Sequence, residues 1–274
     1  MKHNQLAINS ASTGSAAFDV TLSAYEAAGF RHVEFVLGHV RDFLAEDHTP
    51  DDTRALIEGR GLSCIGGFDG KLLCFADAAR RRVNHDRVVD NAELLAALGG
   101  TKLVVGTDGP PDPGGFDDPL GRVADVFRML AERIGETGVD LCLEFNWSPL
   151  VKSLRSAVEV AVRSGAANVG VLFDPAHYHC TPTKFDQINA DTVPLIKHVH
   201  VNDMRDKPGE LSHCNDDRVL PGEGCLDLSA IFGALEEHGY RGLFSIEMFS
   251  EELWALPPVE AAERMYESMQ TYCE

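Results

Sequence analysis

The sequence predicts one α/β domain over residues 1–274, a (β/α)8 TIM barrel. Two observations indicate this fold: short apolar runs alternate with longer helical segments eight times along the chain, and glycines close several of the helical segments. A third observation argues against the competing open, doubly wound sheet, because no GxGxxG or GxxxxGK[ST] motif follows the first apolar run. A length of 274 residues also suits a single barrel.

Each expected strand is a short run rich in β-branched and other apolar residues, and these runs are residues 6–9, 32–37, 62–68, 102–106, 139–145, 169–174, 196–201 and 243–248. The longer segments between them are the expected helices, residues 19–29, 50–59, 77–98, 118–137, 149–165, 184–190, 226–238 and 259–272. The glycines at or just beyond helix ends are Gly29, Gly59, Gly99, Gly138, Gly165 and Gly239. Pro149 fits the first turn of its helix, where a backbone N–H is not needed.

Two connections are much longer than the others. Residues 106–117 are rich in glycine, proline and aspartate, which is typical of a loop. Residues 202–225 form the second long connection. Because both follow strands, both are expected on the rim of the barrel that carries catalytic residues in this fold.

The charge and composition of the chain exclude several classes of function. The sequence holds 24 basic and 43 acidic residues, a formal net charge of −19, which repels nucleic acids and anionic membranes. No stretch approaches the roughly 20 apolar residues of a membrane span, and the first ten residues do not resemble a secretory signal. Seven scattered cysteines without a CxxC pair indicate reduced thiols. We therefore expect a cytoplasmic protein that binds neither nucleic acid nor membrane.

Four of the expected strands end in residues with metal-binding side chains. Glu144, Asp174, His200 and Glu247 come at the ends of the fifth to eighth strands, which meet at one rim of a barrel. Three carboxylates and one imidazole in one place leave negative charge uncompensated unless a cation lies among them. Oxygen ligands with one nitrogen suit a divalent ion, with Mn²⁺ expected first and Mg²⁺, Co²⁺ or Zn²⁺ as alternatives.

Several motifs resemble those of the xylose-isomerase-like barrel superfamily of sugar isomerases and epimerases: LEFN (143–146), FDPAHYH (173–179), HVHVND (198–203) and SIEMF (245–249). Residues 199–228 are similar to the inosose (keto-inositol) isomerase and dehydratase branch, and residues 243–263 support the same branch. The resemblance implies that Glu144, Asp174, His200 and Glu247 bind the metal ion. It also implies that a homo-oligomer is possible, since members of the superfamily often form dimers or tetramers.

The resemblance further implies roles in catalysis and substrate binding. Glu144 and Glu247 would move protons on opposite faces of the reacting carbon, while His177 and Arg205 would contact substrate oxygens. A cation that binds a ketone and its neighbouring hydroxyl stabilises the enediolate, so a nearby carboxylate can remove the α proton. Glu34 and Trp147 either line the pocket or pack at its rim. We expect His198 to face away from the barrel interior.

We therefore expect an isomerase or epimerase of a keto-polyol or keto-sugar, with keto-inositol as the first candidate substrate. The first alternative is a lyase acting on related substrates, such as an inosose dehydratase, a dehydroshikimate dehydratase or a 3-keto-glycoside eliminase. An abasic-site endonuclease is disfavoured by the negative charge, and by Val219 where that family has a metal-binding histidine. A non-catalytic sugar-binding subunit would not need the four charged and metal-binding residues.

Overall fold

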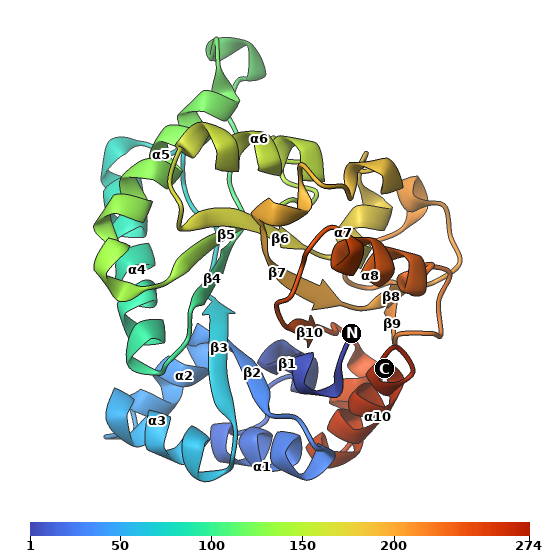
Figure 1. Ribbon diagram of the computed structural model, residues 1–274. Helices are drawn as coiled ribbons and strands as arrows, with labels where there is room; N and C mark the ends of the chain where they lie inside the picture. Colours follow the sequence, from blue (N-terminus) through green and yellow to red (C-terminus); the bar gives the residue numbers. More distant parts are fainter.

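Eight parallel strands close into a barrel (Figure 1). The computed structural model describes residues 1–274 except for the side chain of Pro113. Around the barrel the strand order is β1-β10-β7-β6-β5-β4-β3-β2. The strands are β1 (Leu6–Asn9), β2 (His32–Val36), β3 (Ser63–Phe68), β4 (Lys102–Val105), β5 (Asp140–Glu144), β6 (Val169–Phe173), β7 (Ile196–Val201) and β10 (Phe244–Ile246). The predicted (β/α)8 TIM barrel is therefore confirmed.

Ten α-helices accompany the strands in the described chain, and capping residues set where several of them begin or end. The helices are α1 (Phe18–Ala28), α2 (Leu37–Leu44), α3 (Pro50–Gly59), α4 (Ala78–Ala97), α5 (Pro119–Arg133), α6 (Leu154–Ser164), α7 (Pro175–Cys180), α8 (Leu228–Glu237), α9 (Glu251–Trp254) and α10 (Pro258–Gln270). Thr49 and Asp52 form a capping box at the start of α3. Gly29 ends α1 in the left-handed conformation, with φ of 102°.

Alternate strand positions face opposite sides of the barrel wall. Val171 and Phe173 of β6 are fully buried in the main apolar core, between the strands and the surrounding helices. Leu172 lies between them and belongs to a separate small cluster with Val104 and Cys142. Cys142 lies two residues before Glu144 on β5, so the two side chains face the same side of the strand. This second cluster therefore fills the barrel interior beneath the end of β5.

The differences from the predicted elements lie mainly in the segments that follow the strands. Strand β2 ends at Val36, and α2 follows it directly. Helix α6 begins only at Leu154, because the side chain of Ser153 caps it by accepting a hydrogen bond from the Ser156 N–H. The helix expected at 184–190 is a 3₁₀ turn, Phe185–Gln187, whereas α7 forms immediately after β6.

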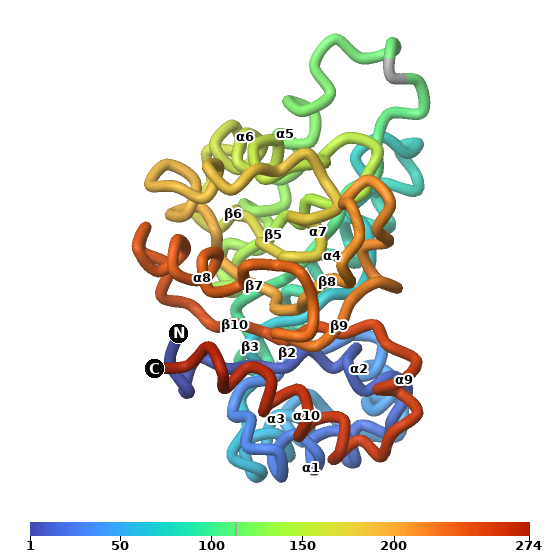
Figure 2. The backbone as a smooth tube through the Cα atoms, turned by 90° about the vertical axis from the view of Figure 1, so that its right-hand side faces the viewer, coloured from blue at the N-terminus to red at the C-terminus, as the bar shows by residue number. Residues whose placement is uncertain are grey.

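The long connection after β7 is partly ordered by a two-stranded sheet that the sequence did not predict. Its strands are β8 (Asp203–Met204) and β9 (Arg218–Val219), which pair antiparallel. Figure 2 shows the two chain termini close together at the end of the barrel opposite to β8, β9 and α9. Within the described chain, no helix combines the length and apolar character needed to cross a membrane.

Candidate functional site

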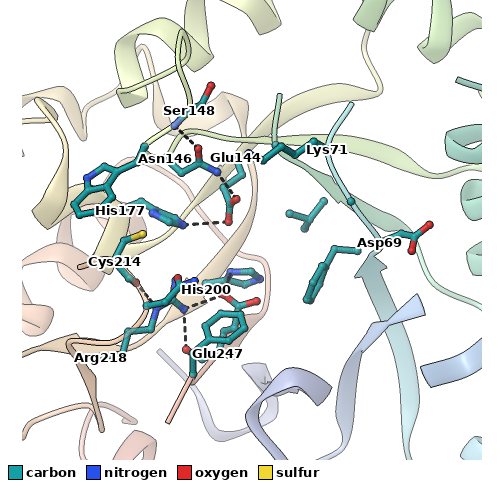
Figure 3. A pocket seen from close by; sticks show the side chains of 17 residues that line it. Asp69, Lys71, Glu144, Asn146, Ser148, His177, His200, Cys214, Arg218 and Glu247 are labelled. Atoms are coloured by element: carbon teal, nitrogen blue, oxygen red, sulfur yellow. Dashed lines mark hydrogen bonds and ion pairs between the residues drawn. The ribbon is translucent and has the colours of Figure 1, made fainter. Parts of the chain in front are cut away.

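A pocket of about 360 Å³ opens at the rim where the strands end (Figure 3). Its wall combines acidic, basic and aromatic side chains from β5, α7, β7, β9 and the segment after β10. The polar and charged residues in this wall include Glu144, Asn146, His177, His200, Arg218 and Glu247. The pocket therefore lies on the rim that the sequence predicted for catalysis.

The structure brings the four expected ligands together. Donor atoms of Glu144, Asp174 and His200 all lie within 4.8 Å of one another. Glu247 joins them through its Oε2 atom, which is 3.2 Å from Nδ1 of His200. All except Glu144 are buried: Asp174 is 0 % exposed, His200 1 % and Glu247 4 %.

Local structure fixes the position of Asp174. It is the N-cap of α7, and its Oδ1 accepts hydrogen bonds from the backbone N–H groups of Ala176 (2.7 Å) and His177 (3.3 Å). Asn202 Nδ2 donates to both of its oxygens, at 3.1 and 3.2 Å. Burial raises the pKa of this carboxyl, but the nearby charges of Arg218 and His177 hold the pKa well below its usual value. Asp174 is therefore an anion in a fixed orientation.

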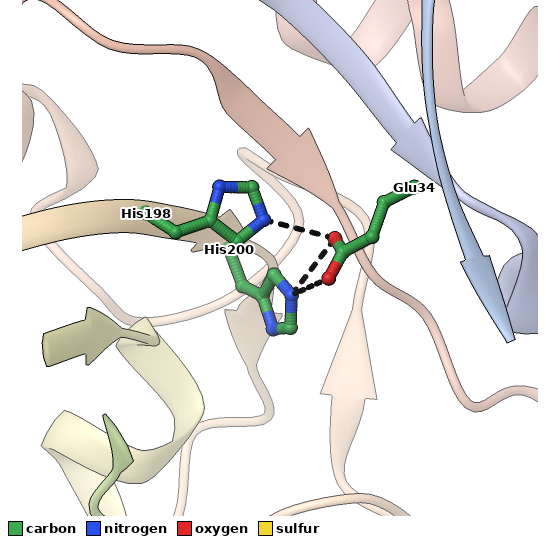
Figure 4. Close-up of side chains that lie close together, drawn as sticks. All are labelled: Glu34, His198 and His200. Atoms are coloured by element: carbon green, nitrogen blue, oxygen red, sulfur yellow. Dashed lines mark hydrogen bonds and ion pairs between the residues drawn. The ribbon is translucent and has the colours of Figure 1, made fainter. Parts of the chain in front are cut away.

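The orientation of His200 is set from the opposite side of the barrel (Figure 4). Its Nε2–H donates to the fully buried carboxylate of Glu34, at 3.0 Å. Glu34 also accepts from His198 Nε2 (3.0 Å) and from the Ser245 hydroxyl (2.9 Å). A metal-binding histidine usually donates one ring N–H to a carboxylate in this way, which leaves the other ring nitrogen to bind the metal ion once it has lost its proton. Nδ1 of His200 is thus directed at the site.

The expectation for His198 was wrong. Residues two apart on a strand point to the same side, so His198 and His200 both face the barrel interior. Glu34, His198 and His200 are close enough to form a second metal-binding group. Their ring nitrogens are already hydrogen-bonded directly to the carboxylate, so we interpret the three residues as a network that supports the site.

The residues present fit a divalent cation. Nδ1 of His200 is buried and makes no hydrogen bond within the described structure, although it lies 3.4 Å from Asp174 Oδ2 and 3.2 Å from Glu247 Oε2. Burial alone would lower the pKa of His200, but Glu247 and Glu34 raise it well above its usual value. The carboxylates that favour a proton on Nδ1 in the metal-free protein also favour a divalent cation in its place.

Replacing Glu34 with glutamine is expected to weaken divalent-metal binding by about 10- to 100-fold, the range typical of lost carboxylate support to a ligating histidine. A glutamine oxygen can accept from one imidazole but does not supply the negative charge that both rings contact. Competition with a chelating dye, using Mn²⁺ and Zn²⁺, measures the effect. The control is Glu58→Gln, since Glu58 pairs only with Arg54 on the surface. Equal metal affinity in Glu34→Gln and wild type would show that Glu34 has no such role.

The two expected substrate-binding residues differ in where they lie. His177 is 4 % exposed, and its Nε2 is 3.3 Å from Glu144 Oε1 inside the pocket. Burial lowers the pKa of His177, but Glu144 and Asp174 raise it to about 10. Arg205 does not join the group: its side chain is 57 % exposed, and its Nε lies 4.0 Å from Asp217.

A different arginine, Arg218, enters the site, and no local pattern in the sequence predicted it. Arg218 is 3 % exposed, and its Nη1 donates to Glu247 Oε2 at 2.8 Å. Its Nη2 is 3.1 Å from Asp174 Oδ2, and its guanidinium lies 5.1 Å from the centre of the Phe249 ring. It reaches the pocket because it lies in β9, which pairs with β8. The sequence of residues 202–225 did not predict this pairing.

Comparisons with known proteins agree with the barrel fold. The model of the family described as xylose isomerase-like TIM barrel matches residues 22–272. An inosose isomerase of Bacillus velezensis is 31% identical over 150 residues, 54% of this chain and 53% of the relative, so the chain spans about half the length of that relative. An inosose dehydratase of Serratia proteamaculans is 24% identical over 88% of this chain and 85% of its own length. A crystal structure of IolI protein with a bound zinc atom superposes with a TM-score of 0.86, at 23% identity, over 98% of this chain and 97% of that protein.

Proposed function

The chain belongs to the xylose isomerase-like TIM-barrel family, and from this premise we propose that it is a divalent-metal-dependent isomerase or epimerase of a keto-polyol or keto-sugar, with keto-inositol as the first candidate substrate. Relatives named as isomerases, dehydratases and epimerases support an enzyme acting on small sugar-like molecules. The observation that carries the proposal is the convergence of Glu144, Asp174 and Glu247 on the unbonded Nδ1 of His200.

When bound, a divalent ion held by Glu144, Asp174, His200 and Glu247 would polarise the ketone and stabilise the charge that develops as the α proton leaves. The protein's own residues supply the proton transfers. Strands β6 and β7 lie between β5 and β10, so Glu144 and Glu247 approach the pocket from separate positions on its wall. One carboxylate removes the proton and the other can return it from a different side.

Two cationic groups are placed to hold substrate oxygens. The imidazole of His177 faces Glu144, and the guanidinium of Arg218 faces Glu247. Asn146 Nδ2 donates to Glu144 Oε2 at 2.8 Å, which fixes that carboxylate while leaving its other oxygen toward His177. A substrate held against these groups places its reacting carbon near the two glutamates.

A lyase is the second candidate, because His177 could act as an acid. With its pKa raised to about 10 by Glu144 and Asp174, this imidazole carries a proton at neutral pH in the metal-free protein. A proton donated to a departing hydroxyl group would give dehydration in place of isomerisation. The dehydratase of Serratia proteamaculans also matches more of this chain than the isomerase of Bacillus velezensis does.

Proton NMR in D₂O distinguishes the two reactions. Protein loaded with Mn²⁺ or Zn²⁺ is incubated with keto-inositols and 3-keto-sugars, then removed with its metal before the spectra are recorded. We expect deuterium at the carbon next to the ketone without loss of water, and no incorporation after treatment with EDTA. An unsaturated product would establish the lyase instead. No exchange and no product with any of these substrates would contradict the proposal.

A further inference from the structure

Asp203, the first residue of β8, is a buried acid that organises the connection carrying Arg218. Its carboxylate is 0 % exposed. Oδ1 accepts hydrogen bonds from the backbone N–H groups of Met204 (2.8 Å) and Leu226 (3.0 Å). Oδ2 accepts from those of Gly222 and Gly224, both at 3.1 Å. One side chain therefore joins the two ends of segment 203–226.

The turn that Asp203 holds is built around two glycines. Gly222 has a φ of 90°, a left-handed conformation that other residues rarely adopt. A Cβ atom on Gly224 would lie 2.3 Å from Asp203 Oδ1 and 2.3 Å from the Met204 carbonyl oxygen. The backbone of the turn thus approaches Asp203 too closely for a side chain at Gly224, which, with the φ of Gly222, explains the two glycines at these positions.

The same short sheet that contains Asp203 also positions Arg218. In the pairing of β8 with β9, Asp203 lies opposite Val219 and Met204 lies opposite Arg218. The Met204 carbonyl accepts from the Cys225 N–H at 2.9 Å, so the 222–226 turn packs against β8 on its other side. A shift of the turn would therefore move β8, and with it the backbone from which Arg218 extends.

We propose that Asp203 is a positioning residue for Arg218: by fixing the 222–226 turn against β8, it sets the depth at which the Arg218 guanidinium meets Asp174 and Glu247. Among the described residues that line the pocket, Asp203 is absent, so it acts through Arg218 and not on the substrate. The expected effect on turnover rests on the proposed function, whereas the effect on the Arg218 side chain does not.

The first test observes Arg218 directly and needs no substrate. Its Nε–H is buried and donates to the Cys214 carbonyl at 2.7 Å, so it should give a slowly exchanging resonance in a ¹H–¹⁵N spectrum, assigned by its loss in Arg218→Met. Asp203→Asn keeps the side-chain shape but turns an NH₂ group toward two backbone donors. We expect the resonance to shift and its proton to exchange at least about tenfold faster, because local opening controls such exchange.

Two further variants keep this test decisive. Glu223→Gln changes an exposed acid in the same turn and should leave the resonance unchanged. Gly222→Ala strains the turn without altering Asp203, and an added Cβ would meet only the Tyr272 hydroxyl, at 3.4 Å. It should reproduce the effect of Asp203→Asn, and it decides the question if that variant does not fold. An unchanged Arg218 resonance in a folded Asp203→Asn protein, or in Gly222→Ala when Asp203→Asn does not fold, would overturn the proposal.

The second test asks whether the two residues act as one unit in catalysis. We expect Asp203→Asn to lower kcat/KM by about 10- to 100-fold, the size of effect that a small misplacement of a binding group can produce. The double variant with Arg218→Met should lie within about threefold of Arg218→Met alone, whereas independent residues would give multiplied losses. Multiplied losses would overturn the proposal. A wild-type protein inactive on every keto-polyol would contradict the proposed function, while the NMR test would still decide the role of Asp203.

Discussion

Glu247→Gln is expected to retain the fold and to lose about 10²- to 10⁴-fold in the rate of deuterium exchange at the substrate carbon, the usual contribution of a positioned acid–base group. The carboxylate of Glu247 accepts from Asn9 Nδ2 at 3.1 Å and from Arg218 Nη1 at 2.8 Å. A glutamine has one acceptor oxygen and cannot satisfy both donors. Asn9 cannot turn its amide to compensate, because its Oδ1 already accepts from the Ala11 N–H.

Because Glu247 also faces His200, the experiment must separate the loss of a proton-transfer group from a loss of metal binding. Exchange is measured by NMR at metal concentrations raised until the rate no longer changes, with metal content determined in the same samples. Asp174→Asn serves as the comparison: it should weaken metal binding and recover part of its activity with excess metal, while Glu247→Gln should not. The control is Glu252→Gln, which makes the same substitution at an exposed acid in α9 and should leave both the fold and the exchange rate unchanged. Full exchange in Glu247→Gln would exclude it as a proton-transfer group.

The barrel and the grouping of the four expected metal ligands could be predicted because their signals are local. Each strand is a short apolar run, and Glu144, Asp174, His200 and Glu247 each stand at or just past a strand end. In a closed parallel barrel, all such ends meet at one rim. Strand position alone was therefore enough to place four side chains from distant parts of the sequence in one site.

The supporting residues could not be predicted because they depend on contacts across the fold. Glu34 reaches His198 from a position 164 residues earlier in the chain, and its strand β2 is separated from β7 by β1 and β10. Arg205 was expected in the site because of the family resemblance, and it lies in the connection after β7. The structure places Arg218 there instead, since the β8–β9 pairing folds the connection back toward the pocket. No periodicity within the connection indicates which arginine turns inward.

Arg218→Met is expected to destabilise the metal-free protein by about 3 to 5 kcal/mol, the usual result of removing one partner from a buried ion pair. Arg218 lies against Asp174 and Glu247, and all three side chains are buried. Methionine fills similar space but supplies no charge. A bound divalent ion would replace part of the lost positive charge, so Mn²⁺ should stabilise Arg218→Met more than wild type. Urea unfolding with EDTA or with Mn²⁺ measures both differences.

Arg205→Met is the matched control, because Arg205 belongs to the same connection but its side chain is 57 % exposed. It should change stability by less than about 0.5 kcal/mol, as surface substitutions usually do. Equal stability of Arg218→Met and wild type in EDTA would show that the carboxylates do not depend on Arg218.

The loss in Arg218→Met should also depend on pH. Arg218 is the largest of the influences that hold the pKa of Asp174 below its usual value. A carboxyl whose pKa is lowered by folding adds stability above its unfolded pKa, and this stability disappears as the pH falls through the folded pKa. Without Arg218 the folded pKa rises and this contribution shrinks. The difference between variant and wild type should therefore be greatest near neutral pH. It should diminish as the pH falls through the folded pKa of Asp174, first that of the variant and then the lower one of wild type. A difference that stayed constant over this range would mean that Arg218 stabilises the site by packing on Phe249 and not by its charge.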